Sequence, residues 1–285
     1  VKVAAEGDGK ASFGLASDLL PPKWFTKVPD DPLEKEIADM LGVIRQALGQ
    51  ALGLEKPTAF ELWKTIYDDQ SAWAKAECIP PLLAHFGTSL VERALIEASC
   101  KAKDQSLGQA LQKGTLGFAP EMIHPVLNGQ PLSELLHPAP LANVQARHTV
   151  GLADPLNAAQ ISVEDQINDS LPQSLDQCIK TYGLLHFKIK INGDIDWDTE
   201  RLKNVAYCIG QNTTDKFAFS LDGNEQFQSI DAFRTHWEKL NEEESLCFFF
   251  NHLLFIEQPL HRDVALNYEL KSEFDQWQDR PPIII

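Results

Sequence analysis

Charged side chains stand at the ends of three successive predicted strands of this sequence. Lys188 and Lys190 lie in FKIKI, Asp222 follows the strand-like KFAFSL, and Glu257 ends LLFIE. An ionised carboxylate at the end of a buried strand costs on the order of several kcal/mol unless a positive charge meets it. Two convergent carboxylates repel each other unless a proton or a cation lies between them, and their oxygens suit Mg²⁺. These residue types therefore predict a metal site with ammonium groups beside it.

Each of these features also has a purely structural explanation. Two lysines on one strand face are common in solvated or edge strands. Asp222-Gly223 is a frequent turn pair, and Glu257 would serve equally in a local salt bridge. The order of ammonium, carboxylate and carboxylate on three successive strand ends favours the functional interpretation. All three groups would point into one shared space at the carboxyl ends of the strands.

The second half of the chain has the alternating pattern that would position these strand ends. We expect strands roughly 30 to 40 residues apart, as parallel βαβ units require, at residues 144–150, 185–191, 216–221, 253–257 and 281–285. Helices are predicted between them, at residues 172–183, 196–210, 229–240 and 264–277. No GxGxxG follows the first strand, which disfavours a dinucleotide-binding fold. The alternation in FKIKI favours a barrel interior, or at least a strand with one polar face.

The first half is predicted to be α+β. Residues 1–17 read as a hairpin around the turn EGDGK, and residues 32–117 have helical periodicity. One helical segment, residues 88–112, would be capped by Thr88 or Ser89. We expect an α+β domain at residues 1–140 and a βα-barrel domain at residues 141–285.

Composition and charge exclude several classes of partner. The formal net charge is −16 and the isoelectric point is about 4.9, which argues against nucleic acid and anionic membranes but not against a small anionic substrate. The most apolar stretch, residues 246–256, is too short to span a bilayer, and no signal peptide is visible. The five cysteines are widely spaced. We interpret them as reduced thiols, most of them buried, in a cytoplasmic protein.

Taken together, FKIKI, SLDGNEQF and FIEQPL resemble the enolase superfamily, in the group of mandelate racemase and muconate lactonizing enzyme. That group has K-x-K at the end of its second barrel strand, D-x-N at the third and E-Q/D-P at the fourth, and all three motifs occur here in order. The likeness extends more weakly over nearly the whole chain, including VKVAAEGDGKASFG and residues 90–111. It implies a (β/α) barrel of enolase-superfamily type, with about five βα units present, preceded by an α+β capping domain.

The resemblance also implies a role for each residue. Asp222 and Glu257 would bind Mg²⁺, and Lys190 would be the base that takes the proton α to a substrate carboxylate. Lys188 would lower the pKa of Lys190 through its like charge. Asn224 would lie at the edge of the metal and orient the substrate or a metal ligand. The implied activity is that of a Mg²⁺-dependent lyase or isomerase on a small carboxylate substrate, acting through an enediolate. A dehydratase, a racemase or epimerase, and a cycloisomerase all fit.

Parts of the family pattern are not found in this sequence. In the family, a third metal ligand follows the fifth strand and the acid or base on the opposite face comes from a later strand. We therefore expect the protein to extend beyond Ile285, and also before Val1. Two other functions stay open: a Schiff-base aldolase that uses Lys190 or Lys188, and a barrel that binds a ligand or partner without turnover. The resemblance is compatible with a homo-oligomer, which no residue demonstrates.

Overall fold

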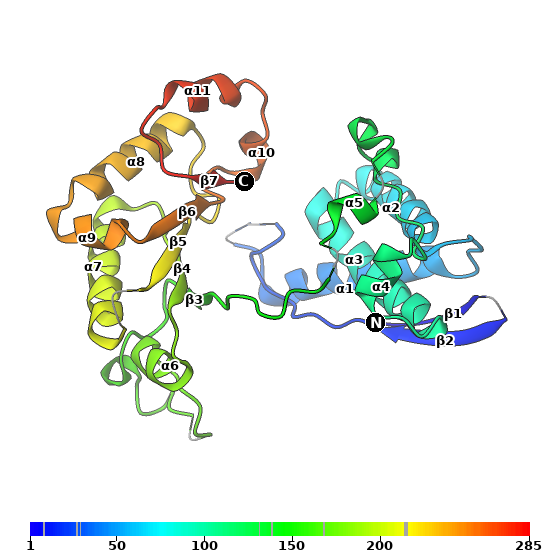
Figure 1. Ribbon diagram of the computed structural model, residues 1–285, viewed down its shortest axis with the longest axis horizontal. Coiled ribbons are helices and arrows are strands. Elements are labelled where there is room, and N and C mark those ends of the chain that lie inside the picture. The colour runs from blue at the N-terminus through cyan, green and yellow to red at the C-terminus, as the bar shows by residue number, and fades with distance from the viewer. Residues whose placement is uncertain are drawn as a thin grey trace. The chain divides into compact units, whose positions relative to one another are not determined.

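The computed structural model divides the chain into two compact units, Val1–Ala142 and Asn143–Ile285. Figure 1 shows the helices and strands of each unit. Each unit has a hydrophobic core of its own. The structure describes residues 1–7, 9–26, 28, 30–130, 132–137, 139–167, 169–213 and 216–285.

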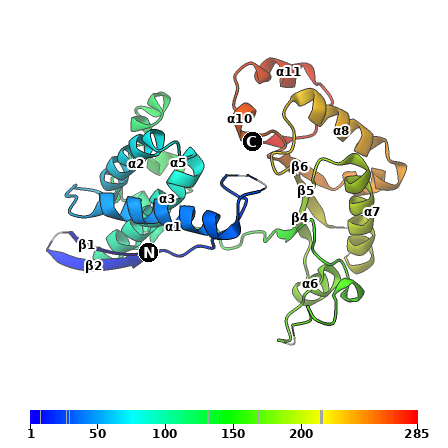
Figure 2. The same ribbon diagram turned by 180° about the vertical axis from the view of Figure 1, so that it is seen from behind.

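An antiparallel hairpin opens the first unit. Strand β1 (Lys2–Gly7) pairs with β2 (Lys10–Leu15), which confirms the predicted hairpin, although Asp8 of its turn lies outside the described residues. The hairpin packs on helix α3 (Pro81–Ala102) (Figure 2). The two elements approach closely at Gly14, where a Cβ atom would lie 1.9 Å from the carbonyl oxygen of Ala94. Only glycine leaves room for the backbone there.

Three long helices form the body of this unit. They are α1 (Leu33–Ala51), α2 (Ala59–Ala76) and α3, and the shorter elements after them are α4 (Leu107–Gln112), α5 (Leu132–Leu135) and the 3₁₀ turns Pro120–Met122 and Pro125–Leu127. The predicted start of a helix at Thr88 or Ser89 is wrong, because α3 begins at Pro81 and Thr88 is buried inside it. The proline in the first helical turn, Pro81, marks the start of α3 instead of the predicted cap residues.

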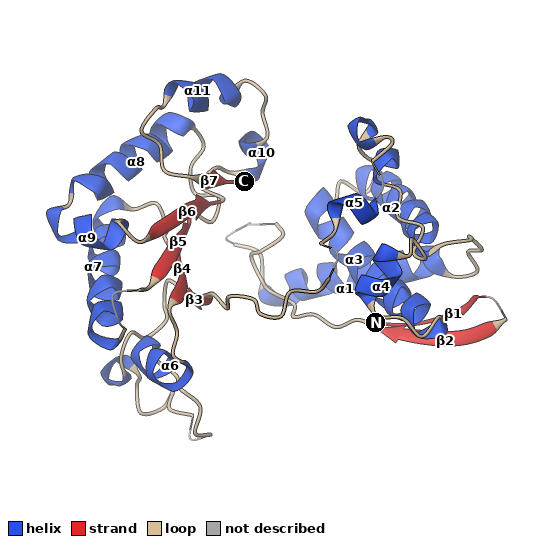
Figure 3. Ribbon diagram, viewed as in Figure 1, coloured by secondary structure: helices blue, strands red, loops and turns tan. Residues whose placement is uncertain are grey.

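The second unit contains a parallel sheet in the order β3-β4-β5-β6-β7 (Figure 3). The strands are β3 (His148–Val150), β4 (His186–Lys190), β5 (Ala218–Asp222), β6 (Leu253–Glu257) and β7 (Ile283–Ile284). All five predicted strands are confirmed, although β3 is shorter than residues 144–150. The described strands form an open sheet with helices, so the unit is α/β.

Helices connect the strands. They are α6 (Leu175–Tyr182), α7 (Ile195–Asn212), α8 (Ile230–Glu242), α9 (Cys247–Phe250), α10 (Arg262–Ala265) and α11 (Leu270–Gln276), with 3₁₀ turns at Ala158–Gln160 and Glu244–Leu246. The single helix predicted at residues 264–277 is wrong. Between α10 and α11 the side-chain Oδ1 of Asn267 accepts a hydrogen bond from the N–H of Glu269, 3.1 Å away, and this local turn competes with the helix.

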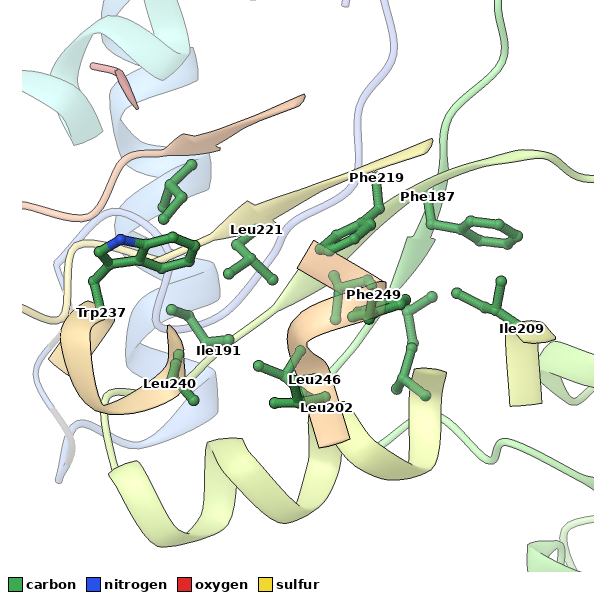
Figure 4. Packing of buried hydrophobic residues seen from close by; sticks show 14 of the residues in the cluster. Phe187, Ile191, Leu202, Ile209, Phe219, Leu221, Trp237, Leu240, Leu246 and Phe249 are labelled. Atoms are coloured by element: carbon green, nitrogen blue, oxygen red, sulfur yellow. The ribbon is translucent and has the colours of Figure 1, made fainter. Parts of the chain in front are cut away.

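One face of the sheet is buried under these helices. Phe187, Phe219 and Leu221 are fully buried against α7 and α9, where Leu202 and Phe249 contribute to the same cluster (Figure 4). The burial pattern of β4 alternates, with Lys188 and Lys190 on the opposite, polar face. The core therefore fixes which side chains of each strand face away from the helices.

Two further expectations concern membranes and thiols. Among the described helices, none combines the length and the apolar character needed to cross a membrane. All five cysteines are unpaired. The expectation that most of them are buried is wrong, because Cys78 and Cys247 are exposed, Cys178 is intermediate, and only Cys100 and Cys208 are buried.

Candidate active site

The register of the sheet brings three predicted site residues into one row. Lys190 pairs with Asp222 across β4 and β5, and Asp222 pairs with Glu257 across β5 and β6. Residues in register on neighbouring strands project to the same face of a sheet. The row lies at the carboxyl ends of the strands, and Lys188 lies two positions below it on the same face.

Lys188 joins the two carboxylates. Its ammonium lies 2.9 Å from Oδ2 of Asp222 and also donates a hydrogen bond to Oε1 of Glu257. The carboxylates are poorly exposed, with side-chain exposures of 6% for Asp222 and 15% for Glu257. Burial lowers the pKa of Lys188, but the hydrogen bonds that it donates to both carboxylates, together with their charges, outweigh burial and hold that pKa above its usual value. Lys188 is therefore a fixed ammonium at neutral pH.

Asp222 is held in its ionised form. Burial raises its pKa, but the hydrogen bond from Lys188, the backbone N–H of Asn224 and the charges of both lysines bring the pKa of Asp222 below its usual value. The N–H of Asn224 donates to Oδ1 at 2.9 Å. Each oxygen of this carboxylate thus has a donor.

Lys190 lies at the edge of the carboxylate pair. Its ammonium donates to Oδ1 of Asn224 at 2.7 Å and lies 3.3 Å from Oδ2 of Asp222. The structure therefore brings all five predicted site residues together, on β4, β5, β6 and the turn after β5: Lys188, Lys190, Asp222, Asn224 and Glu257. Asn224 contacts the amine of Lys190, a contact that the motif did not predict.

Arg147 is a site residue that the sequence analysis missed. It precedes β3, and its guanidinium reaches across the polar face to Oε2 of Glu257, 2.9 Å away. It also donates to Oγ of Ser220 at 2.7 Å, and it lies over the ring of Phe255, 5.4 Å from the ring centroid. The available signal was alternation, because Arg147 is two residues before Thr149 and so shares the polar face of the first strand.

The two loops that follow β5 and β6 are bonded to each other. The N–H of Gly223 donates to the carbonyl of Glu257 at 2.9 Å, and the N–H of Glu225 donates to the carbonyl of Gln258 at 2.8 Å. Arg262 closes the pair with two ion-pair contacts to Glu225, at 2.6 and 2.8 Å. These bonds fix the strand ends that carry Asp222 and Glu257 relative to each other.

Positive φ angles in these loops place strain beside the carboxylates. Asn224, Glu225 and Gln258 have φ angles of 48°, 65° and 45°. Residues other than glycine adopt such angles at a cost of about 1–3 kcal/mol, and they persist where the surroundings impose them. The backbone bonds between the loops provide that constraint here.

Asp198 of α7 holds the loop after β4 in place through hydrogen bonds. This fully buried carboxylate accepts hydrogen bonds from the N–H groups of Asn192 and Gly193, both at 2.9 Å. Nε2 of the buried His236 lies 3.1 Å from Oδ2 of the same carboxylate. Because the loop begins immediately after Ile191, this anchor determines where β4 ends and hence where Lys190 stands.

The carboxylate pair fits an oxygen-seeking divalent cation in its chemistry. One cation, the ammonium of Lys188, already contacts both Asp222 and Glu257, so the two groups are close enough to share a charge. Within the described ranges, no group of three or more His, Cys, Asp or Glu side chains is arranged to hold a metal ion. A cation here would have two carboxylate ligands, with water or substrate completing its shell, as is common for Mg²⁺.

No protein-family model matches the chain, and no curated protein matches it. Solved structures that resemble it include a mandelate racemase/muconate lactonizing protein from Herpetosiphon aurantiacus, with 15% identity over 92% of this chain and a TM-score of 0.48. An enolase from Agrobacterium radiobacter, bound to Na and L-malate, has 14% identity over 96% of this chain and a TM-score of 0.47.

A third similar structure is a mandelate racemase/muconate lactonizing enzyme from Roseiflexus sp., with 17% identity over 99% of this chain and a TM-score of 0.47. The matches cover 55%, 54% and 60% of those three proteins, so this chain spans a little over half of their length. The chain is thus similar to solved proteins described as mandelate racemase/muconate lactonizing enzymes and as an enolase, the class that its strand-end motifs resemble.

Proposed function

We propose that this protein is a Mg²⁺-dependent lyase or isomerase that removes a proton α to the carboxylate of a small substrate. The observation that carries the proposal is the position of the Lys190 amine, 3.3 Å from Asp222 in the row that also contains Glu257. A base and a pair of oxygen ligands at neighbouring strand ends are the two components that such a proton transfer needs.

In the proposed reaction Lys190 accepts the proton as a neutral amine. Oδ1 of Asn224 accepts a hydrogen bond from that amine, and this contact fixes the position of the amine that receives the substrate proton. A divalent cation bound by Asp222 and Glu257 would stabilise the negative charge that develops on the substrate carboxylate. Lys188 stays protonated and keeps the two carboxylates together, so it is a positioning residue.

The outcome after proton removal depends on what lies opposite Lys190. Return of a proton from the other side gives a racemase or epimerase, loss of a β-leaving group gives a dehydratase, and ring closure or opening gives a cycloisomerase. All three share the first step, so the proposal commits to that step and to a carboxylate substrate.

A ligand-binding protein without turnover is the second candidate, and one observation favours it. The polar face holds three cations, Lys188, Lys190 and Arg147, against the two carboxylates Asp222 and Glu257, a formal excess of one positive charge. Such a face attracts an anion whether or not chemistry follows.

A Schiff-base aldolase needs a neutral lysine as its nucleophile. The raised pKa of Lys188 argues against that residue and leaves Lys190. Borohydride trapping with a carbonyl substrate separates the two chemistries, since a stable adduct on Lys190 would replace the metal-dependent proposal.

Exchange of α-protons with solvent tests the leading proposal. Hydroxy acids, sugar acids and amino-acid derivatives would be incubated with the protein in D₂O, with Mg²⁺ or with EDTA, and followed by proton NMR. We expect loss of an α-proton signal for at least one class of carboxylate, and only with Mg²⁺. Tight binding of an anion without exchange across the whole panel would favour the ligand-binding function.

A further inference from the structure

Arg147 makes a specific set of contacts that the proposed reaction does not use. Nη2 lies 2.9 Å from Oε2 of Glu257, and Nη1 donates to Oγ of Ser220 at 2.7 Å. The guanidinium plane also lies over Phe255, and Ser220 is fully buried. Three partners on β5 and β6 hold this side chain in one place, so its contact with Glu257 is a defined part of the site.

All four oxygens of the carboxylate pair accept hydrogen bonds or ion pairs from the protein. Oδ1 of Asp222 accepts from the backbone of Asn224, and Oδ2 accepts from Lys188 and Lys190. Oε1 of Glu257 accepts from Lys188, and Oε2 from Arg147. A divalent cation that binds to Glu257 would therefore lie beside the ammonium of Lys188 or the guanidinium of Arg147, and these like charges repel it.

Of Lys188 and Arg147, Arg147 is the cation that a metal ion would displace more easily from Glu257. Among the residues that the structure describes, Lys188 pairs with two carboxylates, whereas Arg147 pairs with one, that of Glu257. The side chain of Arg147 is also the more exposed of the two, 31% against 22%, so it regains water more readily on leaving.

We propose that Arg147 and a divalent cation compete for Oε2 of Glu257, so that Arg147 sets how tightly the site binds metal. This inference rests on the proposed metal site at Asp222 and Glu257. In the metal-free state the guanidinium stabilises Glu257. In the metal-loaded state it would no longer contact Oε2 of Glu257.

Binding of Mn²⁺, measured by electron paramagnetic resonance of the free ion, tests this inference without any substrate. The variant Arg147→Gln removes the competing charge. We expect it to bind Mn²⁺ at least about tenfold more tightly than the wild type, because the ion no longer has to break a charge-assisted hydrogen bond. The matched control is Arg234→Gln on α8, where Arg234 pairs with the exposed Glu238 at 2.6 Å, and its affinity should stay within about twofold of the wild type.

Two further variants keep the test decisive. Ser220→Ala leaves all charges in place but removes one partner of Arg147, and it should tighten Mn²⁺ binding by a smaller factor. Adding Asp222→Asn to the Arg147→Gln variant should abolish the gain, which locates the ion at the carboxylate pair.

The outcomes separate this inference from the proposed function. Equal Mn²⁺ affinity in wild type and Arg147→Gln, or weaker binding in the variant, overturns the competition and leaves the proton-transfer function standing. A gain that survives Asp222→Asn also overturns it. If no variant binds Mn²⁺ at millimolar concentration, both the competition and the metal in the proposed function are overturned.

Discussion

Lys188 and Glu257 are hydrogen-bonded to each other although their strands are not neighbours in the sheet. Strand β5 lies between β4 and β6, and Lys188 passes over it to reach Glu257 while also contacting Asp222. The lysine therefore links the ends of three strands. This relationship predicts that the stability of the second unit and the geometry of the site depend on the same ammonium.

Replacing Lys188 by Met should destabilise the protein by about 3 kcal/mol in EDTA, because two poorly exposed carboxylates lose their shared cation. Mg²⁺ should restore part of that loss by taking over the bridging charge. Chemical unfolding with and without Mg²⁺ measures both effects. Lys180→Met, at an exposed pair with Asp176, is the control and should change stability by less than about 0.5 kcal/mol. Unchanged stability in Lys188→Met would contradict the bridging role.

A methyl group at Gly223 should disturb the carboxylate pair. Its Cβ would lie 2.6 Å from the Cα of Pro259 in the loop after β6, so the two loops would have to separate. We expect Gly223→Ala to destabilise the protein by about 1–3 kcal/mol and to weaken metal binding. Gly210→Ala in α7 meets nothing within 4 Å and should stabilise by about 0.5–1 kcal/mol. Equal effects of the two substitutions in thermal melts would show that the loops do not pack closely.

The depressed pKa of Asp222 predicts a specific acid sensitivity. Because the folded-state pKa lies below the usual 3.8, ionised Asp222 contributes stability above that pH, and the contribution is lost as pH falls through the folded value. Urea unfolding between pH 5 and about pH 2 should show a steeper loss of stability for the wild type than for Asp222→Asn. The exposed control Asp279→Asn should keep the wild-type slope. A parallel pair of curves for wild type and Asp222→Asn would refute the coupling.

Thiol reactivity should follow burial. Burial raises the pKa of the Cys208 thiol to about 11, and its Sγ also donates to the carbonyl of Leu156. At pH 8 only about one molecule in a thousand carries this thiolate. We expect the exposed Cys78 and Cys247 to react rapidly with a disulfide reagent and Cys208 only after unfolding. Mass spectrometry of partially labelled protein gives the order, and early labelling of Cys208 would contradict the packing of α7.

Local patterns predicted most of the fold. The alternation in FKIKI located β4 within a residue, and the apolar run in LLFIE located β6. Gly183, with a φ angle of 61°, ends α6 where the sequence places it. The errors come from competition between signals. A proline started α3 earlier than the expected cap, and a side-chain turn at Asn267 divided the last predicted helix.

The parts of the candidate site that follow from strand geometry were predictable from the sequence. The contact that depends on the conformation of a long side chain was not. Strand ends and alternation place Lys190, Asp222 and Glu257 in one row, which the register confirms. The contact of Arg147 with Glu257 spans from the segment before β3 to the end of β6. No spacing in the sequence encodes it, because it depends on the curvature of the sheet and on the conformation of a long side chain.

The most direct test of the proposed chemistry is deuterium wash-in at the α-carbon of a carboxylate substrate, compared between the wild type and Lys190→Ala with Mg²⁺ present. Lys180→Ala serves as a control for loss of an exposed lysine. The account predicts wash-in by the wild type and the control, and a loss of at least about a hundredfold in Lys190→Ala with Mn²⁺ binding retained. Wash-in that persists unchanged in Lys190→Ala, or its absence from the wild type across every carboxylate tested, would contradict it.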